Sequence, residues 1–442
     1  MPLPSRGMNL RKKNCLLIVI DCLRADKALS IKNSSLALKF LIRNGVTFTH
    51  CIAPASTTTP CFGSILTGCY PLTHGIRSVY GFKLNKEVLT IQEVFKMNGY
   101  NTYAFVTGPL LPEMGLNRGF DGYEYRDHNI GVSSKWFQEL VLKFKTKQFK
   151  EPWFILLHLF DLHRSKRDLF IYWDDALRVR IKINLRDFLK GREARYHQAL
   201  LSIDEKLFEL LNCLDLDNTL IIVTGDHGEL LEISRVKEFS NEFKKDLHII
   251  GQKVNLKWLI RFDSTTDKKI IVGHGFHVYD YLIRVPLILV DVNTLTKGGI
   301  ISEMVRQIDI FPTIVDILDL IFKGLVHGES ILNLTKGKYR SQRIAYIEAC
   351  GAVLGSVKNW RFAIRTPRYK YVCALYNEKI PEELYDLEKD PEERNIAEIR
   401  RDLVQIFRKR LHQIRKECLS LKEKLKVQRK IYELKCKRLL HK

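Results

Sequence analysis

The chain has 442 residues, of which 45% are hydrophobic and 28% charged, a composition that excludes a disordered protein. This length exceeds what one small core serves, so we expect two domains or one large domain with a smaller appendage. The formal net charge is +22, and residues 400–442 hold 16 Lys and Arg against 4 Asp and Glu. More than half of the positive excess therefore lies in the last tenth of the chain. The remainder is mildly basic, which would suit an anionic substrate.

Cysteine usage and hydropathy predict a cytoplasmic protein. The ten cysteines form no CxxC pair and show no regular spacing, which favours reduced thiols over a zinc ribbon or a disulfide framework. The apolar run Cys15–Ile20 has six residues, fewer than the about 7–15 of a signal-peptide core. No stretch approaches the about 18 consecutive apolar residues of a membrane span. Peripheral attachment to a membrane is the alternative to a freely cytoplasmic protein.

Four short apolar runs rich in β-branched residues predict buried strands of a parallel sheet. In chain order they read "CLLIVID", "PWFILLHLFD", "TLIIVTGD" and "VPLILVD". A helical pattern at Arg195–Leu214 precedes the third run, and alternating strands and helices predict an α/β fold with helices on both faces of the sheet. Asp21, Asp161 and Asp226 follow the first three runs. Because ligands gather at the carboxyl ends of such strands, we expect these aspartates near one edge.

The pattern changes toward the C-terminus. Residues 230–272 are polar and basic and predict an insertion with helical parts, whereas Asn359–Tyr376 predicts a small antiparallel hairpin or meander. From Asp402 onward apolar residues recur every three or four positions with basic residues between them, which predicts one long amphipathic helix or a short coiled coil. We therefore divide the chain into a main domain at 13–336, interrupted by the insertion, a subdomain at 337–400 and a basic helix at 401–442.

The tetrapeptide "DHGE" suggests a metal site. Its Asp226 and His227 directly follow a predicted strand, and Asp21 follows the first strand in the same way. Two carboxylates and one imidazole suit Mn²⁺, Mg²⁺, Ca²⁺ or Zn²⁺ and leave coordination positions for a substrate. A single Asp at a strand end more often caps a helix or anchors a hydrogen bond. The combination therefore carries the prediction.

Several stretches, in this order, resemble the sulfatase family of the alkaline-phosphatase superfamily over residues 13–400. They include "LLIVIDCLRAD", "TTPCFGSILTGCYPLTHGI", "GLNRGFDGYEY" and "SIDEKLFELLNCLDLDNTLIIVTGDHGE". The segments "YDYLIRVPLILV" and "EELYDLEKDPEERNIA" extend the resemblance toward the C-terminus. The resemblance implies a mixed sheet sandwiched by helices, with a small C-terminal subdomain that contains strands. It also implies a divalent metal ion and an anionic ester substrate.

The resemblance implies a nucleophile within "TTTPCFGSILTG". In sulfatases this loop reads Cys-x-Pro-Ser-Arg, followed by "LTG" at a fixed spacing, and counting back from Leu66 places Thr58 at the cysteine position. Threonine cannot become formylglycine, as the family's cysteine does, but related phosphoglycerol and phosphoethanolamine transferases use the threonine hydroxyl itself. We predict Thr58 as nucleophile and metal ligand, with Thr57 and Thr59 turned away along an extended loop. The alternative is that all three are ordinary loop threonines.

Further site residues follow from the same resemblance. His163 matches a family histidine near the ester oxygen, and we predict that it protonates the leaving group. His274 and His277 lie near the last active-site element of the family, where a Lys or His touches the substrate anion, and His274 is the favoured catalytic residue of the two. Thr107 is a candidate anion contact. His158 is expected to be structural.

The chain departs from the family pattern at Cys22, at Phe62 and before "GLNRGFD", where "TGPLL" stands in place of the family's usual lysine–histidine pair. Cys22 stands where the family has a second acidic ligand, and Phe62 stands where it has an arginine. Cys22 could bind a softer metal, but we favour a buried bystander next to a single metal ion. These losses favour the alternative of an inactive scaffold that binds an anionic partner through its basic tail. The retained metal and acid residues favour an enzyme that hydrolyses or transfers a sulfate or phosphate ester through a covalent threonine intermediate.

The basic tail has two interpretations. The simpler one is a solvated helix that packs on the body or on a second copy of the chain. The other is a surface that binds lipid head groups or acidic polysaccharide. Nucleic acid is disfavoured, because aromatic side chains do not alternate with basic ones as stacking platforms.

Overall fold

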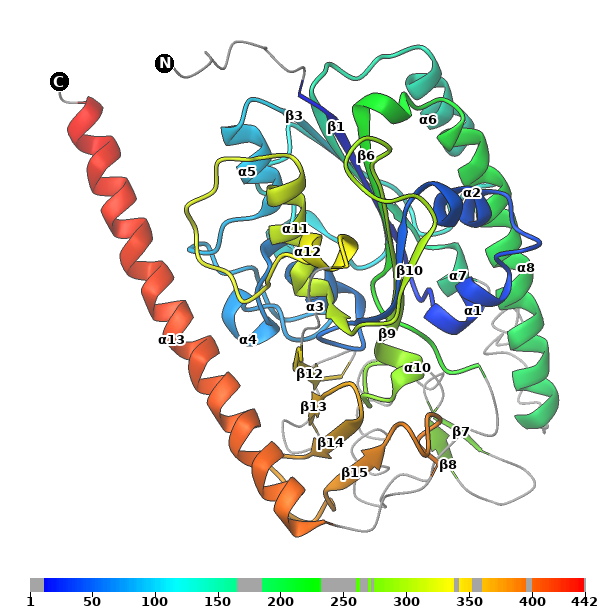
Figure 1. The fold of residues 1–442 in the computed structure, drawn as a ribbon, viewed down its shortest axis with the longest axis vertical. Coiled ribbons are helices and arrows are strands. Elements are labelled where there is room, and N and C mark those ends of the chain that lie inside the picture. Colours follow the sequence, from blue (N-terminus) through cyan, green and yellow to red (C-terminus); the bar gives the residue numbers. More distant parts are fainter. Residues whose placement is uncertain are drawn as a thin grey trace, which may run out of the picture.

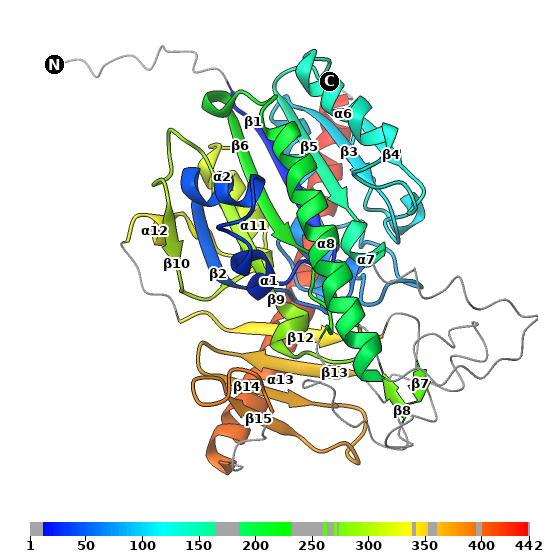
Figure 2. The same cartoon turned by 90° about the vertical axis from the view of Figure 1, so that its right-hand side faces the viewer.

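The structure, a computed structural model, describes residues 12–164, 185–231, 260–262, 269–271, 274–337, 342–351, 360–394 and 400–440. A nine-stranded sheet with helices on both faces forms the main domain, and a four-stranded antiparallel sheet lies at one end of it (Figures 1 and 2). The strand order of the large sheet is β10-β2-β9-β6-β1-β5-β3-β4, and β11 pairs with β2. Its strands are β1 (Asn14–Ile20), β2 (Val46–Ile52), β3 (Asn101–Val106), β4 (Gly122–Tyr125), β5 (Trp153–Leu159), β6 (Thr219–Gly225), β9 (Arg284–Val290), β10 (Gly299–Ile301) and β11 (Val305–Arg306).

Strand β1 lies in the interior of the sheet and is buried on both faces. Cys15, Leu17 and Val19 belong to one core cluster, whereas Leu16, Ile18 and Ile20 belong to the cluster on the opposite face. A strand covered on both faces needs apolar residues at successive positions, which explains the unbroken apolar run. The helices of the first cluster are α3 (Thr58–Thr67), α5 (Ile91–Met97), α11 (Ile310–Ile317) and α12 (Leu332–Thr335). Those of the second are α1 (Ala25–Ser30), α2 (Ala37–Asn44), α6 (Lys135–Lys145), α7 (Asp161–Arg164) and α8 (Leu185–Leu211).

The direction of the strands decides which residues meet. β1 runs parallel to both β5 and β6, so their carboxyl ends share one edge of the sheet. Asp21, Asp161 and Asp226 follow these three strands at that edge, as predicted. β9 runs antiparallel to β2 and β6, so the prediction of a parallel strand for "VPLILVD" is wrong. The chain leaves β6 and enters β9 from α10 (Asp280–Ile283) at the same edge, so β9 must run back across the sheet.

The C-terminal subdomain contains the sheet β12-β13-β14-β15. Its strands are β12 (Ala345–Ala349), β13 (Arg361–Arg365), β14 (Tyr369–Cys373) and β15 (Glu383–Asp386). The hairpin β13–β14 confirms the prediction for residues 359–376. In the predicted insertion the structure describes the two-stranded sheet of β7 (Ile260–Phe262) and β8 (Lys269–Ile271), and the helical parts expected there lie outside the described residues. Short elements elsewhere are α4 (Pro71–His74), η1 (Pro112–Met114), η3 (Leu216–Asn218) and η6 (Gln307–Asp309).

The last element, α13 (Arg401–Leu440), confirms the predicted long amphipathic helix. It runs along the outside of the molecule from the C-terminal sheet past α4 (Figure 1). One apolar face packs on the C-terminal sheet, through Val404, Phe407, Leu411, Ile414 and Cys418. Farther along, Leu425 packs on Cys69 and Val88 of the main domain. Over the helix that the structure describes with side chains, the apolar spacing therefore serves packing on the body. None of the described helices is both long enough and apolar enough to cross a membrane.

A buried ionic cluster joins the C-terminal sheet to α10. The Asp280 carboxylate accepts hydrogen bonds from Lys370 Nζ at 2.7 Å and from Arg365 Nη2 at 3.0 Å. Lys370 Nζ also lies 2.6 Å from Glu393 Oε1, and the Lys370 side chain is fully buried. Burial alone would raise the pKa of Asp280, but Arg365 and Lys370 hold it far below its usual value. The C-terminal sheet and α10 of the main domain are thus held together by buried ion pairs.

We predict that Lys370→Ala lowers the free energy of unfolding by about 3–5 kcal/mol, because it leaves Glu393 buried without its cation and Asp280 paired with Arg365 alone. Arg368→Ala is the matched control, since Arg368 pairs with Asp386 in the same sheet but its side chain is 43% exposed. That change should leave the free energy of unfolding nearly unchanged, because solvent screens an exposed ion pair. Urea unfolding followed by circular dichroism measures both. Equal losses in the two variants would contradict a structural role for the buried cluster.

Candidate active site

Three predicted metal ligands converge at the carboxyl edge of β1 and β6. Asp21, Asp226 and His227 each offer one ligand atom, and these atoms all lie within 4.8 Å of one another. All three side chains are fully buried. The register explains the convergence, because Ile20 pairs with Gly225 and the residues that follow are Asp21 and Asp226. The predicted convergence is therefore observed, whereas the role of each residue stays a prediction.

The segment Gly225–Glu229 passes very close to other parts of the backbone. A Cβ atom on Gly225 would lie 2.5 Å from Leu23 O, and one on Gly228 would lie 2.0 Å from Tyr281 O. Glycine at both positions lets the loop pack tightly against its neighbours. Gln307 Nε2 then donates to the carbonyls of Gly225 and Asp226, at 2.7 Å in each case. The loop that carries Asp226 and His227 is thus held rigidly.

The two aspartates lie next to each other in the interior, but their surroundings differ. Burial raises the pKa of Asp226 well above its usual value, and the charge of Asp21 adds to this. Burial would also raise the pKa of Asp21, but the nearby imidazoles of His158, His163 and His227 lower it well below its usual value. Among the described residues, none donates a hydrogen bond to Asp226 Oδ2. A carboxylate oxygen that accepts no hydrogen bond, beside a second carboxylate and an imidazole, fits a divalent cation.

Thr58 lies at this cluster. Its Oγ1 donates to Asp21 Oδ2 at 3.1 Å and lies 3.3 Å from His227 Nε2. Thr58 is the first residue of α3 and Thr57 is its N-cap, so the prediction of an extended loop through all three threonines is wrong. Because side chains on a helix rotate by about 100° per residue, Thr59 still points elsewhere. Its Oγ1 donates to the carbonyls of Ser78 and Val79.

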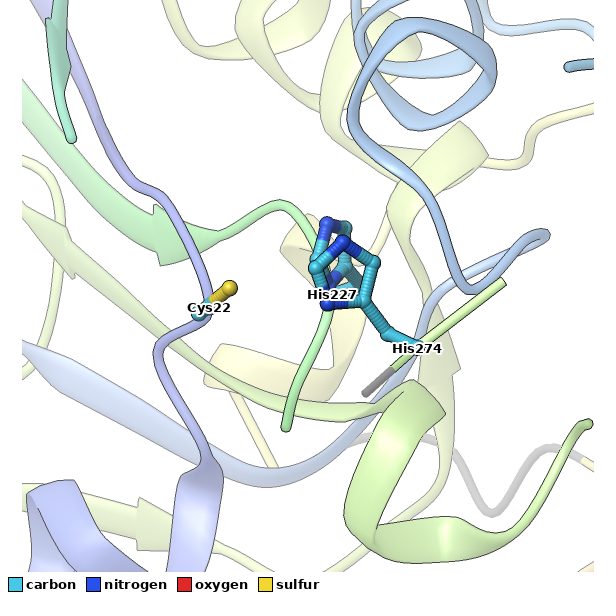
Figure 3. Close-up of side chains that lie close together, drawn as sticks. All are labelled: Cys22, His227 and His274. Atoms are coloured by element: carbon cyan, nitrogen blue, oxygen red, sulfur yellow. The ribbon is translucent and has the colours of Figure 1, made fainter. Parts of the chain in front are cut away.

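Three aromatic rings extend the cluster toward solvent. The rings of His227 and His274 lie 4.3 Å apart, and those of His274 and His163 lie 5.5 Å apart. His163 stacks on Phe160 at 4.4 Å and is only partly buried. Figure 3 shows Cys22 pointing toward the imidazoles of His227 and His274. The structure thus brings His163 and His274 to the predicted site.

The two predicted substrate contacts have other neighbours. Thr107 is fully buried, and its Oγ1 donates to Arg126 O at 2.8 Å. His277 stacks on Tyr279 at 3.6 Å, and its Nε2 lies 3.4 Å from Glu383 Oε1 in the C-terminal sheet. Contact of either residue with a substrate stays a prediction.

Sequence reasoning missed part of the support around the site. Glu229 is fully buried and pairs with Arg192 at 2.8 Å and with His274 at 3.0 Å. Glu229 stands inside "DHGE" and could have been found there, whereas nothing in the sequence of α8 marks Arg192. His158, expected to be structural, places Nε2 3.5 Å from Asp21 Oδ2. Phe62, which replaces the family's arginine, packs edge-on against the His158 ring at 4.8 Å.

Comparison with known proteins identifies the family. The sulfatase family model matches residues 13–320, and a model of the N-sulphoglucosamine sulphohydrolase C-terminal region matches residues 274–417. The first match covers more than half of the chain. The protein therefore belongs to the sulfatase family, and it is a hydrolase of the sulfuric or phosphoric ester class.

Individual relatives are distant. An ulvan-active sulfatase of Formosa agariphila is 22% identical over 403 residues, which are 81% of this chain and 71% of the relative. A solved 2-O GAG sulfatase superposes with a TM-score of 0.69 at 16% identity, covering 94% of each chain. The phosphonate monoester hydrolase of Agrobacterium radiobacter superposes with a TM-score of 0.63 at 18% identity, covering 94% of this chain and 96% of the other. The structural likeness confirms the mixed sheet between helices and the C-terminal antiparallel sheet.

We predict that Asp226→Asn abolishes the stabilisation of the protein by divalent cations without lowering the stability of the metal-free protein. The amide keeps the Oδ1 acceptor for the N–H groups of Cys22 and His227 but removes one of two adjacent buried charges. In the wild type, a cation at about 100 times its Kd should add about 2.7 kcal/mol.

Thermal unfolding with and without divalent salts, after treatment with EDTA, measures this effect. Asp291→Asn is the control, because Asp291 also follows a strand and is buried, but pairs with Lys13. A cation response retained in Asp226→Asn and absent from Asp291→Asn would contradict the site.

Proposed function

We propose that the protein is a metal-dependent enzyme that hydrolyses or transfers a sulfate or phosphate ester through a covalent Thr58 intermediate. One observation carries the proposal: Thr58 Oγ1 lies within hydrogen-bonding distance of both Asp21 Oδ2 and His227 Nε2. A threonine hydroxyl at the first position of a helix, against a carboxylate and an imidazole, is suited to act as a nucleophile.

Asp21, Thr58, Asp226 and His227 would hold the cation. A bound divalent ion would lower the pKa of the threonine hydroxyl and neutralise charge on the non-bridging oxygens of the ester. Two features support this assignment: Asp226 Oδ2 accepts no hydrogen bond from the described residues, and the Asp21 carboxylate is adjacent to it.

Thr58 attacks the sulfur or phosphorus atom, and its proton passes to Asp21 Oδ2, which accepts its hydrogen bond. The bond from the sulfur or phosphorus atom to the ester oxygen breaks, and the departing alkoxide takes a proton from His163. The amino terminus of α3 favours the anionic group, because first-turn N–H groups have no acceptor within the helix. Water or an acceptor alcohol then gives its proton to His163 and displaces Thr58 from the covalent ester, and the released Thr58 oxygen takes back the proton held by Asp21.

The substrate proposal rests on the relatives and on the chemistry of the site. A sulfatase that acts on ulvan, a 2-O GAG sulfatase and a phosphonate monoester hydrolase all resemble this chain. We infer an anionic ester that His274 contacts directly, with His277 and Thr107 as weaker candidates. The exposed basic side of α13 remains a candidate for an anionic membrane surface or for self-association. The cytoplasmic location remains a prediction.

A substrate panel tests the activity. Aryl sulfate, phosphate monoester, phosphodiester and phosphonate monoester substrates are each assayed with Mn²⁺, Mg²⁺, Ca²⁺ and Zn²⁺ after removal of bound metal. We expect turnover of at least one anionic ester, dependent on added cation. Absence of turnover across the panel, in a preparation that binds metal, would count against the enzyme and favour the scaffold alternative.

We predict that Thr58→Ala lowers kcat by several orders of magnitude, because the covalent step is lost. Thr58→Ser should keep partial activity, since the oxygen remains while the methyl group that restricts its rotamer is lost. Thr59→Ala is the control, because its hydroxyl bonds only backbone carbonyls among the described residues. It should cost about 1 kcal/mol of stability and tenfold or less in rate. If Thr59 proves essential and Thr58 dispensable, the assignment of the nucleophile is wrong.

A further inference from the structure

We propose that Cys22 is a ligand of the metal centre, and that its thiolate, together with His227 and His274, makes the centre selective for a zinc-class ion over Ca²⁺ and Mg²⁺. Cys22, His227 and His274 each offer one ligand atom, and these atoms lie within 4.8 Å of one another. The set shares His227 with the Asp21 and Asp226 set. This inference deepens the proposed function, because it concerns the same site.

The backbone holds Cys22 from two sides. Its N–H donates to Asp226 Oδ1 at 3.0 Å, and its carbonyl accepts from the Tyr196 hydroxyl at 2.9 Å. Its φ of 61° lies in the left-handed region, which is strained for a residue other than glycine and persists only where the surroundings impose it. The direction of the thiol is therefore fixed by the fold.

The thiol points at the metal site. Cys22 Sγ lies 3.0 Å from Asp21 Oδ1 and 3.8 Å from Glu229 Oε2, and the side chain is fully buried. A protonated thiol satisfies Asp21 by donating a hydrogen bond. The thiolate would instead place a second negative charge against that carboxylate, and a cation bound by both removes the repulsion. The thiol proton leaves to solvent as the metal binds.

Both imidazoles are oriented through their Nδ1 atoms. His227 Nδ1 lies 2.8 Å from Gly228 O, and His274 Nδ1 lies 3.0 Å from Glu229 Oε2. Arg192 pairs with the other oxygen of Glu229, at 2.8 Å. A carboxylate or carbonyl that accepts from one ring nitrogen fixes the other nitrogen as the metal ligand, the arrangement typical of zinc-bound histidines. The geometry thus points to His227 Nε2 and His274 Nε2 as ligand atoms, a role for His274 that replaces the direct substrate contact assigned to it under the proposed function.

The chemistry of this donor set decides the ion. Ca²⁺ and Mg²⁺ prefer oxygen ligands throughout, whereas a thiolate with imidazoles suits Zn²⁺ and related transition metals. Cys22, which the sequence suggested as a bystander, therefore becomes the residue that sets the metal preference.

Cobalt substitution of the full-length, metal-free protein tests the proposal without substrate. Co²⁺ is the probe, because cobalt bound to thiolate gives an intense charge-transfer band in the near ultraviolet. We expect this band in the wild type, its loss when equimolar Zn²⁺ displaces the cobalt, and no displacement by Ca²⁺ or Mg²⁺ at 100-fold excess. A wild-type protein that binds Co²⁺ without the band, or that loses it to Ca²⁺, would overturn the proposal.

Matched variants separate the thiol ligand from a structural thiol. Cys22→Ala should lose the band and weaken Zn²⁺ binding by more than about 100-fold, whereas loss of the orienting carboxylate in Glu229→Gln should weaken it about 10–100-fold. Cys15→Ala is the control, because Cys15 is an equally buried thiol on the adjoining strand, and it should keep both properties. Cys22→Asp should shift the preference toward Mn²⁺, Mg²⁺ or Ca²⁺.

Each outcome is decisive. A band that survives in Cys22→Ala overturns the proposal, and if that variant does not fold, the wild-type spectrum decides alone. A zinc–thiolate centre in a protein that turns over no ester would leave this inference standing and remove the proposed function. Turnover supported by Ca²⁺ with no thiolate band would do the reverse.

Discussion

Two carboxylates side by side in a dry interior are the constraint on which this site depends. Asp21 and Asp226 are both fully buried, and their environments push their pKa values in opposite directions. Like charges so close in a medium of low dielectric cannot both persist without a cation or a proton. Two imidazoles lie beside these carboxylates. His158 lies within 3.5 Å of an oxygen of Asp21, and His227 lies within 3.5 Å of an oxygen of Asp226. A divalent cation would neutralise the two carboxylates and would also bind Thr58, which is hydrogen-bonded to Asp21.

The sheet produces this arrangement through strand direction. Parallel pairing of β1 and β6 in register sets Asp21 beside Asp226, and parallel pairing of β1 and β5 brings His158 into the same layer. The amino terminus of α3 delivers Thr58 to the same edge. Each of these elements is buried by an apolar core on one face or both, so the polar cluster is held by a rigid frame, as catalytic geometry requires.

The fold is that of the sulfatase family, whereas the resemblance predicts that two site positions depart from the family pattern. Phe62, which the resemblance places at an arginine position, packs against the His158 ring. Cys22, which the resemblance places at an acidic ligand position, contacts the Asp21 carboxylate through its thiol. The carboxylate that remains nearby, Glu229, contacts His274 and Arg192 instead.

The sequence by itself determined the α/β class, the strands β1, β5 and β6, the amphipathic α13 and the convergence of Asp21, Thr58, Asp226 and His227. Apolar runs, helical spacing and residues at strand ends are local signals that survive without an alignment, whereas Thr58 was placed at the site by the resemblance of its loop to the sulfatase motif. It did not determine that β9 runs antiparallel or that Thr58 begins a helix, because both depend on where the chain re-enters the sheet. Nor did it reveal Arg192 behind Glu229 or the direction of the Cys22 thiol. Only tertiary structure decides those, because buried polar groups are matched by partners far away in the sequence, 174 residues away for the Tyr196 hydroxyl that holds Cys22.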